Sequence, residues 1–305
     1  MSRIDFNPVS LADKPLYEKY LFSERERGCE FSFANLYLWG EQSIAQGQGH
    51  ILLRARFGAR TVYPYPLGEG DKKAVLDAII ADAEALKISC LITGLDATAR
   101  ETVERLYPDA FDFQYNDGSY DYVYDIDDLS ELRGKKYDGK RNHVSRFYKA
   151  HPCCAALPIT EESIPALRAF AERWYAGRLA ADPSTDFHME KEALARAFDN
   201  FRALGLVGVM LREGEDILAF SLASRLREDT FDVHFEKARA DVVGAYAAIN
   251  RALACYIKEE YPTVRYLDRE EDMGIAGLRK AKESYHPHHM VKKCRAHLRE
   301  RSHEN

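Results

Sequence analysis

The pattern of hydrophobic and polar positions is clearest in the second half of the chain. Three apolar runs at 206–214, 216–226 and 230–238 are separated by short polar turns, and this spacing predicts an antiparallel meander. The next segment, 242–261, repeats apolar residues with helical spacing, so one side of this helix should lie against a sheet. Its apolar positions are Val243, Tyr246, Ala247, Ile249, Leu253, Tyr256 and Ile257. A short strand at 263–268 and a helix at 274–285 follow.

The remaining segments alternate between helix and strand patterns. Helical spacing is present in six of them: 11–21, 71–87, 98–108, 137–150, 160–178 and 189–204. Strand patterns are present at 51–58, 60–68, 88–96 and 119–127, and the first two read as a hairpin. Asp71 is a candidate helix N-cap, and the period of 31–39 is not clear.

The element order of the second half is helices, meander, long helix, parallel-type strand and helix. By analogy of order, this is a GNAT (acyl-CoA N-acyltransferase) domain. The first third has a shorter version of the same order. We therefore expect an α+β protein of two tandem GNAT-like domains with mixed sheets flanked by helices. The predicted N-terminal domain spans 1–117, and the predicted C-terminal domain spans 118–305 and carries the active cleft.

Composition fits a globular protein. The 305 residues are 46% hydrophobic and 30% charged, which is far from the signature of a disordered chain. No apolar run approaches the roughly 20 residues that span a bilayer, and the N-terminus lacks the apolar core of a signal peptide. We therefore expect a cytoplasmic protein without a transmembrane segment. The six cysteines form no CxxC pair, so reduced thiols are the simplest interpretation.

Charge is segregated along the chain although the net charge is only -6. The segment 117–128 contains five aspartates and no base, whereas 133–149 contains seven Lys or Arg and one Asp. The basic segment has two interpretations, a solvated helix face or a site for polyanions. In the second, phosphates of an acyl donor or of RNA would contact four side chains, Lys135, Lys136, Lys140 and Arg141, with Tyr137 available to stack.

The start of the helix at 242–261 is where a GNAT fold would bind donor phosphates, since free backbone N–H groups and the positive end of the helix dipole favour anions there. The usual phosphate loop has a Gln or Arg, two residues, Gly, one residue, then Gly or Ala. This chain offers Arg239 followed by Gly244 and Ala245, with different spacing. Asp241 would repel a pyrophosphate unless it is the helix N-cap. The match to an acetyl-CoA loop is weak.

A run of five charged residues, Asp268 to Asp272, lies between the strand at 263–268 and the helix at 274–285. Glu271 and Asp272 would be stabilised if they stood at the helix N-terminus. In a GNAT fold, Glu236 at the end of the meander would lie on a strand end adjacent to that of Glu270 or Asp272. A carboxylate there can remove a proton from an attacking amine. Structural ion pairs, such as Glu236 with Arg269, are the alternative.

The candidate site therefore combines these residues. Catalytic candidates are Glu236, Glu270 and Tyr246. Candidates for substrate binding are Arg269, Asp272, Asn250, Lys280, Lys282 and Tyr285. For Tyr246, Tyr285 and the lysines, core packing or a solvated face is the stronger interpretation. The histidines at 286–289 beside Pro287 cannot all face one ion, so no metal is expected there.

Three segments resemble known families. The stretch 121–150 resembles the opening of the second domain of Fem-type peptidyl transferases, which use aminoacyl-tRNA. The stretches 235–250 and 267–287 resemble a bacterial family of unknown function related to the C-terminal domain of phosphatidylglycerol lysyltransferase. The resemblance covers essentially the whole chain, and it implies a tandem GNAT fold and a transferase ancestry.

The expected function is transfer of an activated acyl group to an amine or hydroxyl acceptor. No cofactor is expected to be tightly bound, and acyl-CoA or aminoacyl-tRNA would be the co-substrate. The resemblance implies a small-molecule, peptidoglycan-type or lipid-type acceptor, and tRNA as a partner. The alternative is a non-catalytic module that binds a small ligand or RNA on a degenerate GNAT fold.

Overall fold

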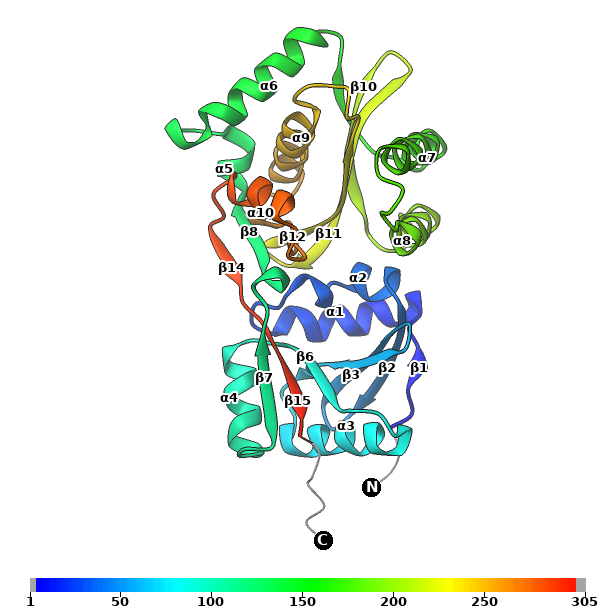
Figure 1. Ribbon diagram of the computed structural model, residues 1–305, viewed down its shortest axis with the longest axis vertical. Helices are drawn as coiled ribbons and strands as arrows, with labels where there is room; N and C mark the ends of the chain where they lie inside the picture. Colours follow the sequence, from blue (N-terminus) through cyan, green and yellow to red (C-terminus); the bar gives the residue numbers. More distant parts are fainter. Residues whose placement is uncertain (1–3, 300–305) are drawn as a thin grey trace. The chain divides into compact units, whose positions relative to one another are not determined.

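The structure is a computed structural model that describes residues 4–299 (Figure 1). Contacts divide the chain into two compact units. The first unit extends to Asp121 and also contains Glu271–Gly274 and the chain from Val291 onward. The second unit contains Tyr122–Glu270 and Ile275–Met290. Within the described residues, no helix is long and apolar enough to cross a membrane.

The first unit is built on a mixed sheet with the strand order β1-β2-β3-β4-β6-β15-β7, and β5 pairs with β3. Its strands are β1 (Asn7–Pro8), β2 (Glu41–Gly47), β3 (His50–Phe57), β4 (Arg60–Pro64), β5 (Leu67–Gly68), β6 (Leu91–Leu95), β7 (Phe111–Tyr115) and β15 (Cys294–Leu298). Its helices are α1 (Lys14–Ser23), α2 (Phe33–Leu38), α3 (Lys72–Leu86) and α4 (Ala97–Leu106).

One face of this sheet forms an apolar core with α3. Tyr63 on β4, Ile92 on β6 and Ala296 on β15 are fully buried in a cluster with Ile79 of α3. The α3 helix begins where its sequence predicts, because the Asp71 side chain accepts hydrogen bonds from the backbone N–H groups of the first turn. Neighbouring residues on these strands alternate to the opposite face of the sheet.

The second unit has the strand order β14-β8-β13-β12-β11-β10-β9. Its strands are β8 (Asp121–Asp125), β9 (Ala155–Pro158), β10 (Val207–Glu213), β11 (Asp216–Arg227), β12 (Thr230–Ala238), β13 (Tyr266–Asp268) and β14 (His289–Val291). Its helices are α5 (Ile126–Glu131), α6 (Asp138–Ala150), α7 (Ile164–Ala181), α8 (His188–Asp199), α9 (Ala245–Glu260) and α10 (Ala276–Glu283). Figure 1 shows α9 on one face of the sheet and α7 with α8 on the other.

The predicted meander and long helix are confirmed. Strands β10, β11 and β12 pair antiparallel in sequence, and β12 then pairs parallel with β13. The buried side of α9 carries Ile249, Leu253 and Ile257. Two members of its predicted apolar stripe are exposed, however: Val243 precedes the helix and is 66% exposed, and Tyr246 in the first turn is 45% exposed. A third, Tyr256, is only partly buried.

Mixed α+β architecture is confirmed, but the units are not two continuous segments. The sequence analysis assigned everything after 117 to the second domain. In the structure, β15 pairs with both β6 and β7, so the last described strand lies inside the first unit's sheet. Six strands and two helices had no counterpart among the predicted elements: β1, β2, β7, β9, β14, β15, α2 and α5.

Gly244 allows the packing at the start of α9 to be tested. It caps α9 with a φ of +82°, and a Cβ there would lie 2.4 Å from the carbonyl oxygen of His143. We expect Gly244→Ala to destabilise the protein by about 2 kcal/mol, because both the backbone conformation and the close approach disfavour a side chain. Gly177→Ala, in an open position inside α7, should be neutral or stabilising. Urea unfolding compares the two; equal effects would contradict the prediction.

Candidate functional site

The candidate site lies where β12 and β13 separate. The two strands pair at only three positions, ending with Asp232 opposite Asp268. Strand β12 continues to Ala238, while the chain after β13 turns away. The last part of β12 therefore has no β13 partner, and the side chains there lie beside a gap in the sheet.

A β-bulge in β12 decides which side chains face α9. On β11, Leu222 pairs with Phe235 and Ala223 pairs with Val233, so His234 is an extra residue. The bulge reverses the alternation along β12. As a result Glu236 lies on the same face as Val233 and Ala238, which pack in the core with α9.

Glu236 is the centre of a polar cluster on this face. Its Oε1 accepts a hydrogen bond of 2.9 Å from Arg269 Nη2, and its Oε2 lies 3.5 Å from Asn250 Nδ2 on α9. Both side chains of the ion pair are only 13% exposed. The Arg269 guanidinium also lies over the rings of Tyr285 (5.0 Å) and Tyr124 (5.7 Å). The predicted pairing of Glu236 with Arg269 is present in the structure.

Four buried polar atoms of this cluster make no hydrogen bond within residues 4–299. Two are Nε and Nη1 of Arg269, and the others are Asn250 Oδ1 and Ser221 Oγ. Ser221 is the cross-strand neighbour of Glu236 on β11, so it belongs to the same location. Buried polar groups are normally satisfied, and each exception calls for a ligand, a water or an ion. Four such atoms on three residues, gathered at one ion pair, are the arrangement of a binding site.

Lys140 on α6 belongs to the same cluster. Its Nζ donates to Ser284 Oγ (2.6 Å) and lies 3.7 Å from the centre of the Tyr285 ring. Burial and the positive charge of Arg269 lower the pKa of Lys140 to about 8. Burial also raises the pKa of Tyr285 to about 12, so its hydroxyl stays protonated.

The comparisons with known proteins agree with the predicted resemblance. The family model described as "Phosphatidylglycerol lysyltransferase, C-terminal" matches residues 23–297. The chain belongs to this family. No curated protein matches the sequence.

Several solved structures resemble this chain. A conserved protein of unknown function from Bacteroides thetaiotaomicron is 35% identical over 97% of this chain and 100% of its own, with a TM-score of 0.91. The L-PGS structure from Bacillus licheniformis is 17% identical (94% and 93% covered, TM-score 0.65). FemX is 9% identical (96% and 97% covered, TM-score 0.61). A tandem GNAT protein from the clavulanic acid biosynthesis pathway is 10% identical (97% and 98% covered, TM-score 0.50). The last three show likeness of fold.

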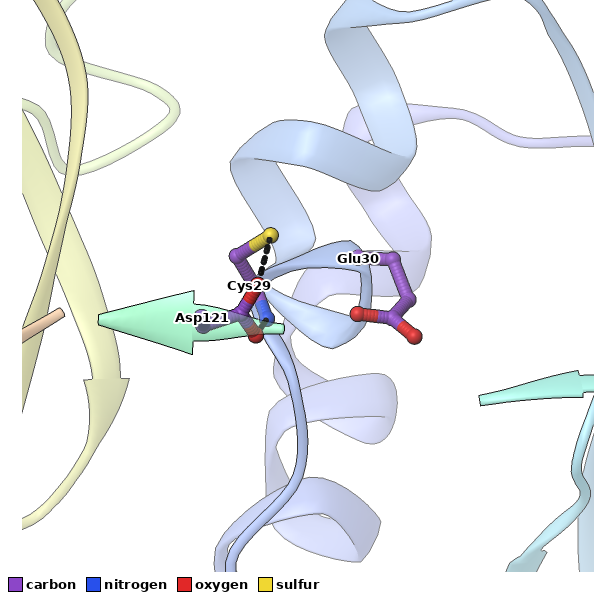
Figure 2. Close-up of side chains that lie close together, drawn as sticks. All are labelled: Cys29, Glu30 and Asp121. Atoms are coloured by element: carbon purple, nitrogen blue, oxygen red, sulfur yellow. Dashed lines mark hydrogen bonds between the residues drawn. The ribbon is translucent and has the colours of Figure 1, made fainter. Parts of the chain in front are cut away.

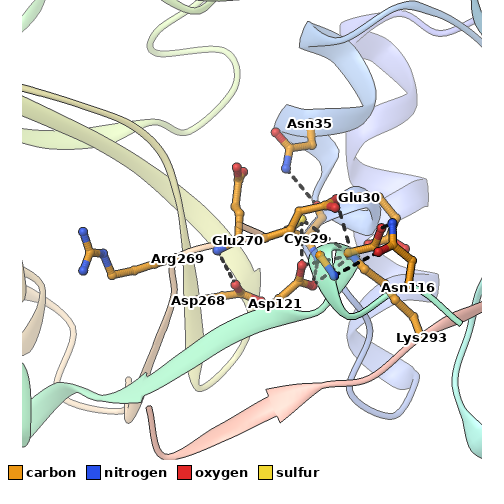
Figure 3. Close-up of polar contacts among 12 residues, drawn as sticks. Cys29, Glu30, Asn35, Asn116, Asp121, Asp268, Arg269, Glu270 and Lys293 are labelled. Carbon is orange, nitrogen blue, oxygen red and sulfur yellow. Dashed lines mark hydrogen bonds and ion pairs between the residues drawn. The ribbon is translucent and has the colours of Figure 1, made fainter. Parts of the chain in front are cut away.

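Glu270 has different partners from Glu236. Its Oε1 lies 3.5 Å from Nδ1 of His234, which is 3.5 Å from Asp232 Oδ2, and Nε2 of His234 hydrogen-bonds Ser224 Oγ at 2.8 Å. Asp232, His234 and Glu270 each offer one ligand atom within 4.8 Å of the others, so this set has the chemistry to hold a divalent metal. Glu270 has a φ of +57°, in the left-handed region, and Figure 3 shows its backbone N–H bonded to Asp268.

The other residues that were predicted to bind substrate lie in different places and have different partners. Lys282 is buried, and its Nζ donates to the backbone carbonyls of Arg269 and Glu270, so it holds this loop in place. Lys280 is exposed on α10. Asp272 is buried in the first unit, where its Oδ1 accepts from Gly274 N at 2.7 Å. The predicted dipole stabilisation of Glu271 and Asp272 is wrong, because α10 begins only at Ala276.

The predicted phosphate-binding residues are mostly engaged elsewhere. Lys136 pairs with Asp128 at 2.9 Å, and Arg141 donates to the carbonyls of Leu132 and Gly134 at the end of α5. Arg239 forms a two-bond ion pair with Asp241. Lys135 is exposed, and Gly244 is the N-cap of α9. Lys140 is the member of the basic segment that the structure places beside Glu236 and Arg269.

The sequence analysis missed a second buried cluster, in the first unit. Figure 2 shows Cys29, Glu30 and Asp121 together, and Figure 3 adds Lys293. Lys293 Nζ lies 2.9 Å from Asp121 Oδ1 and 2.5 Å from Glu30 Oε2. Burial opposes the charge of Lys293, but these acidic groups raise its pKa well above the ordinary value. The ammonium group thus supplies the positive charge that a metal would bring to Cys29, Glu30 and Asp121. No sequence motif links residues so far apart.

Removing the Lys293 charge should be costly. Lys293→Met leaves Asp121 buried without its cation, and we expect a loss of about 3–5 kcal/mol in the free energy of unfolding. Adding Asp121→Asn should recover part of this loss. Lys73→Met, which breaks the exposed pair with Asp77, should cost less than about 1 kcal/mol. Urea unfolding measures the unchanged protein, Lys293→Met, Asp121→Asn, the double variant and Lys73→Met. A double variant whose loss equals the sum of the two single losses would contradict the coupling.

The pKa of Lys140 should report on its two charged neighbours. In NMR of the reductively 13C-methylated protein, the signal that disappears in Lys140→Gln should titrate near pH 8. Arg269→Met should raise this pKa because it removes a positive charge, and Glu236→Gln should lower it because it removes a negative one. Arg146→Met, on an exposed position of α6, should leave it unchanged. An unmoved signal in Arg269→Met would show that the two groups do not interact.

Proposed function

We propose that the second unit transfers an activated acyl group, preferentially an aminoacyl group from aminoacyl-tRNA, to an amine or hydroxyl acceptor in the gap between β12 and β13. The observation that carries this proposal is the group of buried polar atoms without partners around the Glu236–Arg269 ion pair. Membership of the phosphatidylglycerol lysyltransferase C-terminal family supports transfer chemistry.

Arg269 supplies the electrostatic part of the reaction. Its Nε and Nη1 are buried N–H donors, and a carbonyl oxygen of the acyl group would accept from them. Negative charge develops on that oxygen as the acceptor attacks, and a fixed guanidinium in a poorly solvated site stabilises it. Glu236 holds Arg269 in position, and its carboxylate also suits the α-ammonium group of an aminoacyl donor.

Lys140 is the proton acceptor in this proposal. A lysine with a pKa of about 8 is partly neutral at neutral pH, so it can take the proton from the attacking amine or hydroxyl. A new ester or amide bond then forms, and the bond to the donor's leaving oxygen breaks. Tyr285 donates a hydrogen bond as a neutral phenol. Glu270 and Tyr246 are proposed to contact parts of the substrates other than the acyl group. Glu270 would do so together with His234, and Tyr246 from the first turn of α9.

Aminoacyl-tRNA suits this site as the acyl donor better than acyl-CoA does. Arg239, the cation that precedes α9 in the sequence, is paired with Asp241 and is therefore a poor partner for a pyrophosphate. The basic segment instead exposes Lys135, Arg146 and Lys149, whose side chains make no hydrogen bond or ion pair among the described residues and so suit an RNA backbone. A small-molecule, lipid-type or peptidoglycan-type acceptor remains our proposal from the family's description.

We also propose that both units are GNAT-like. In each, a three-stranded antiparallel meander is followed by a helix and a parallel strand: β2-β3-β4, α3 and β6 in the first, and β10-β11-β12, α9 and β13 in the second. An antiparallel strand from outside the meander then completes each sheet, β15 beside β6 and β8 beside β13. The likeness to a tandem GNAT protein supports the same interpretation.

Arg269→Met tests the proposal. Deacylation of a radiolabelled aminoacyl-tRNA mixture is measured with phosphatidylglycerol vesicles as acceptor, and CoA release from acetyl-CoA is measured in parallel. We expect protein-dependent turnover of aminoacyl-tRNA and a loss of at least about 100-fold in Arg269→Met. Arg212→Met, which removes a partly exposed arginine in the same sheet, is the control and should keep full activity.

Other outcomes separate the alternatives. Turnover of acetyl-CoA but not of aminoacyl-tRNA would identify acyl-CoA as the donor. Binding of tRNA or CoA without turnover of either would favour a non-catalytic module. Full activity in Arg269→Met would remove the proposed role of the buried guanidinium.

A further inference from the structure

The first unit contains a pocket of its own. It has a volume of about 320 Å³, which lies in the range of small-molecule sites. It is lined from four adjacent strands of the sheet, by Val62 on β4, Thr93 on β6, Arg295 on β15 and Gln114 on β7. These residues alternate with the core residues Tyr63, Ile92 and Ala296, so the pocket lies on the sheet face opposite the α3 core.

Two arginine side chains in this pocket have no partner among residues 4–299. Arg60 at the start of β4 and Arg295 on β15 both line it, and neither guanidinium group makes a hydrogen bond or ion pair with a described residue. Other arginines of this sheet are paired: Arg54 with Asp82 and Arg56 with Glu41. The guanidinium groups of Arg60 and Arg295 therefore keep their N–H donors and their charge for a ligand.

The backbone around Arg295 departs from regular strand pairing. The pairing of β15 with β6 shifts between Cys294 and Ala296, so Arg295 lies opposite the irregular segment Thr93–Gly94. Such bulges redirect side chains and are frequent near sites. Gly94 has a φ of +69°, and a Cβ there would lie 2.6 Å from the Phe31 ring. Both the backbone conformation and the close contact with Phe31 therefore disfavour a side chain at this position.

The remaining wall combines neutral hydrogen-bonding groups with one charge cluster. Gln114, Asn116 and Ser119 add side-chain amide and hydroxyl groups. Lys293 and Glu30 reach the pocket from the buried cluster (Figure 3), and Glu271 lines it as well. Lys293 Nζ lies 2.5 Å from Glu30 Oε2, 2.9 Å from Asp121 Oδ1 and 3.9 Å from Glu271 Oε1, so its positive charge is already shared among these carboxylates. Among the cations that line the pocket, Arg60 and Arg295 are the ones without a carboxylate partner in residues 4–299.

We propose that this pocket binds a small oxyanion, a carboxylate or a phosphate monoester, between Arg60 and Arg295. Planar guanidinium groups match the two oxygens of such anions, and the amide and hydroxyl groups of the wall bind the rest of the molecule. This inference concerns the first unit and does not depend on the proposed transfer reaction.

Isothermal titration calorimetry of the full chain tests the site with three probes: inorganic phosphate, glycerol 3-phosphate and glutamate. We expect saturable binding of at least one probe, with affinity reduced on the order of 10-fold or more in Arg60→Gln and in Arg295→Gln. The probe that binds distinguishes free phosphate, a phosphate ester and a carboxylate. Arg56→Gln, on the neighbouring strand but outside the pocket, should bind as the unchanged protein does.

Two results would overturn the proposal. One is the absence of saturable binding for all three probes. The other is binding that survives both Arg60→Gln and Arg295→Gln but is lost in Arg269→Met, which would place the anion site in the second unit. Because the readout is binding and not turnover, a failure of the transferase proposal would leave this test unaffected.

Discussion

The parallel pairing of β12 with β13 ends after three positions, and the polar site of the second unit depends on this limit. If β13 paired along the whole of β12, the facing backbone groups of the two strands would be hydrogen-bonded to each other and no gap would remain in the sheet. Because β13 turns away after Asp268, Arg269 can place its guanidinium against β12. The bulge at His234 is the second condition, since it turns Glu236 toward α9 and Arg269. Together they place a buried ion pair beside groups that still have hydrogen bonds to make.

The two units share one construction, in which each sheet is completed by a strand from elsewhere in the chain. In the first unit this strand is β15, which lies between β6 and β7. Until it is in place, both neighbours have an unpaired edge, and unpaired edges favour association with other chains. The buried ion pair of Lys293 with Asp121 stands one residue before β15, so it ties the start of this strand to the unit. Burial makes that pair specific and costly to break.

The charged run Asp268–Asp272 has several functions that its sequence does not separate. Arg269 pairs with Glu236, Glu270 lies near His234, and Asp272 accepts a backbone hydrogen bond from Gly274. The boundary between the two units falls within the run, between Glu270 and Glu271. Backbone carbonyls of Arg269 and Glu270 are held by buried Lys282, which explains why a charged side chain is placed under this loop. The charges are structural partners as well as candidates for chemistry.

Periodicity and capping by themselves determined the meander, the long helix α9 and the Asp71 cap, because these depend on neighbours in the sequence. The motifs also indicated the family, and they singled out Glu236 and Arg269. Only the tertiary structure decided that Lys140 joins them, that His234 is bulged, and that Asp121 meets Lys293. Those contacts join residues up to 172 positions apart, so no local pattern records them. The place of β15 in the first sheet was beyond sequence analysis for the same reason: strand pairing is set by packing, and a short strand carries little signal of its partner.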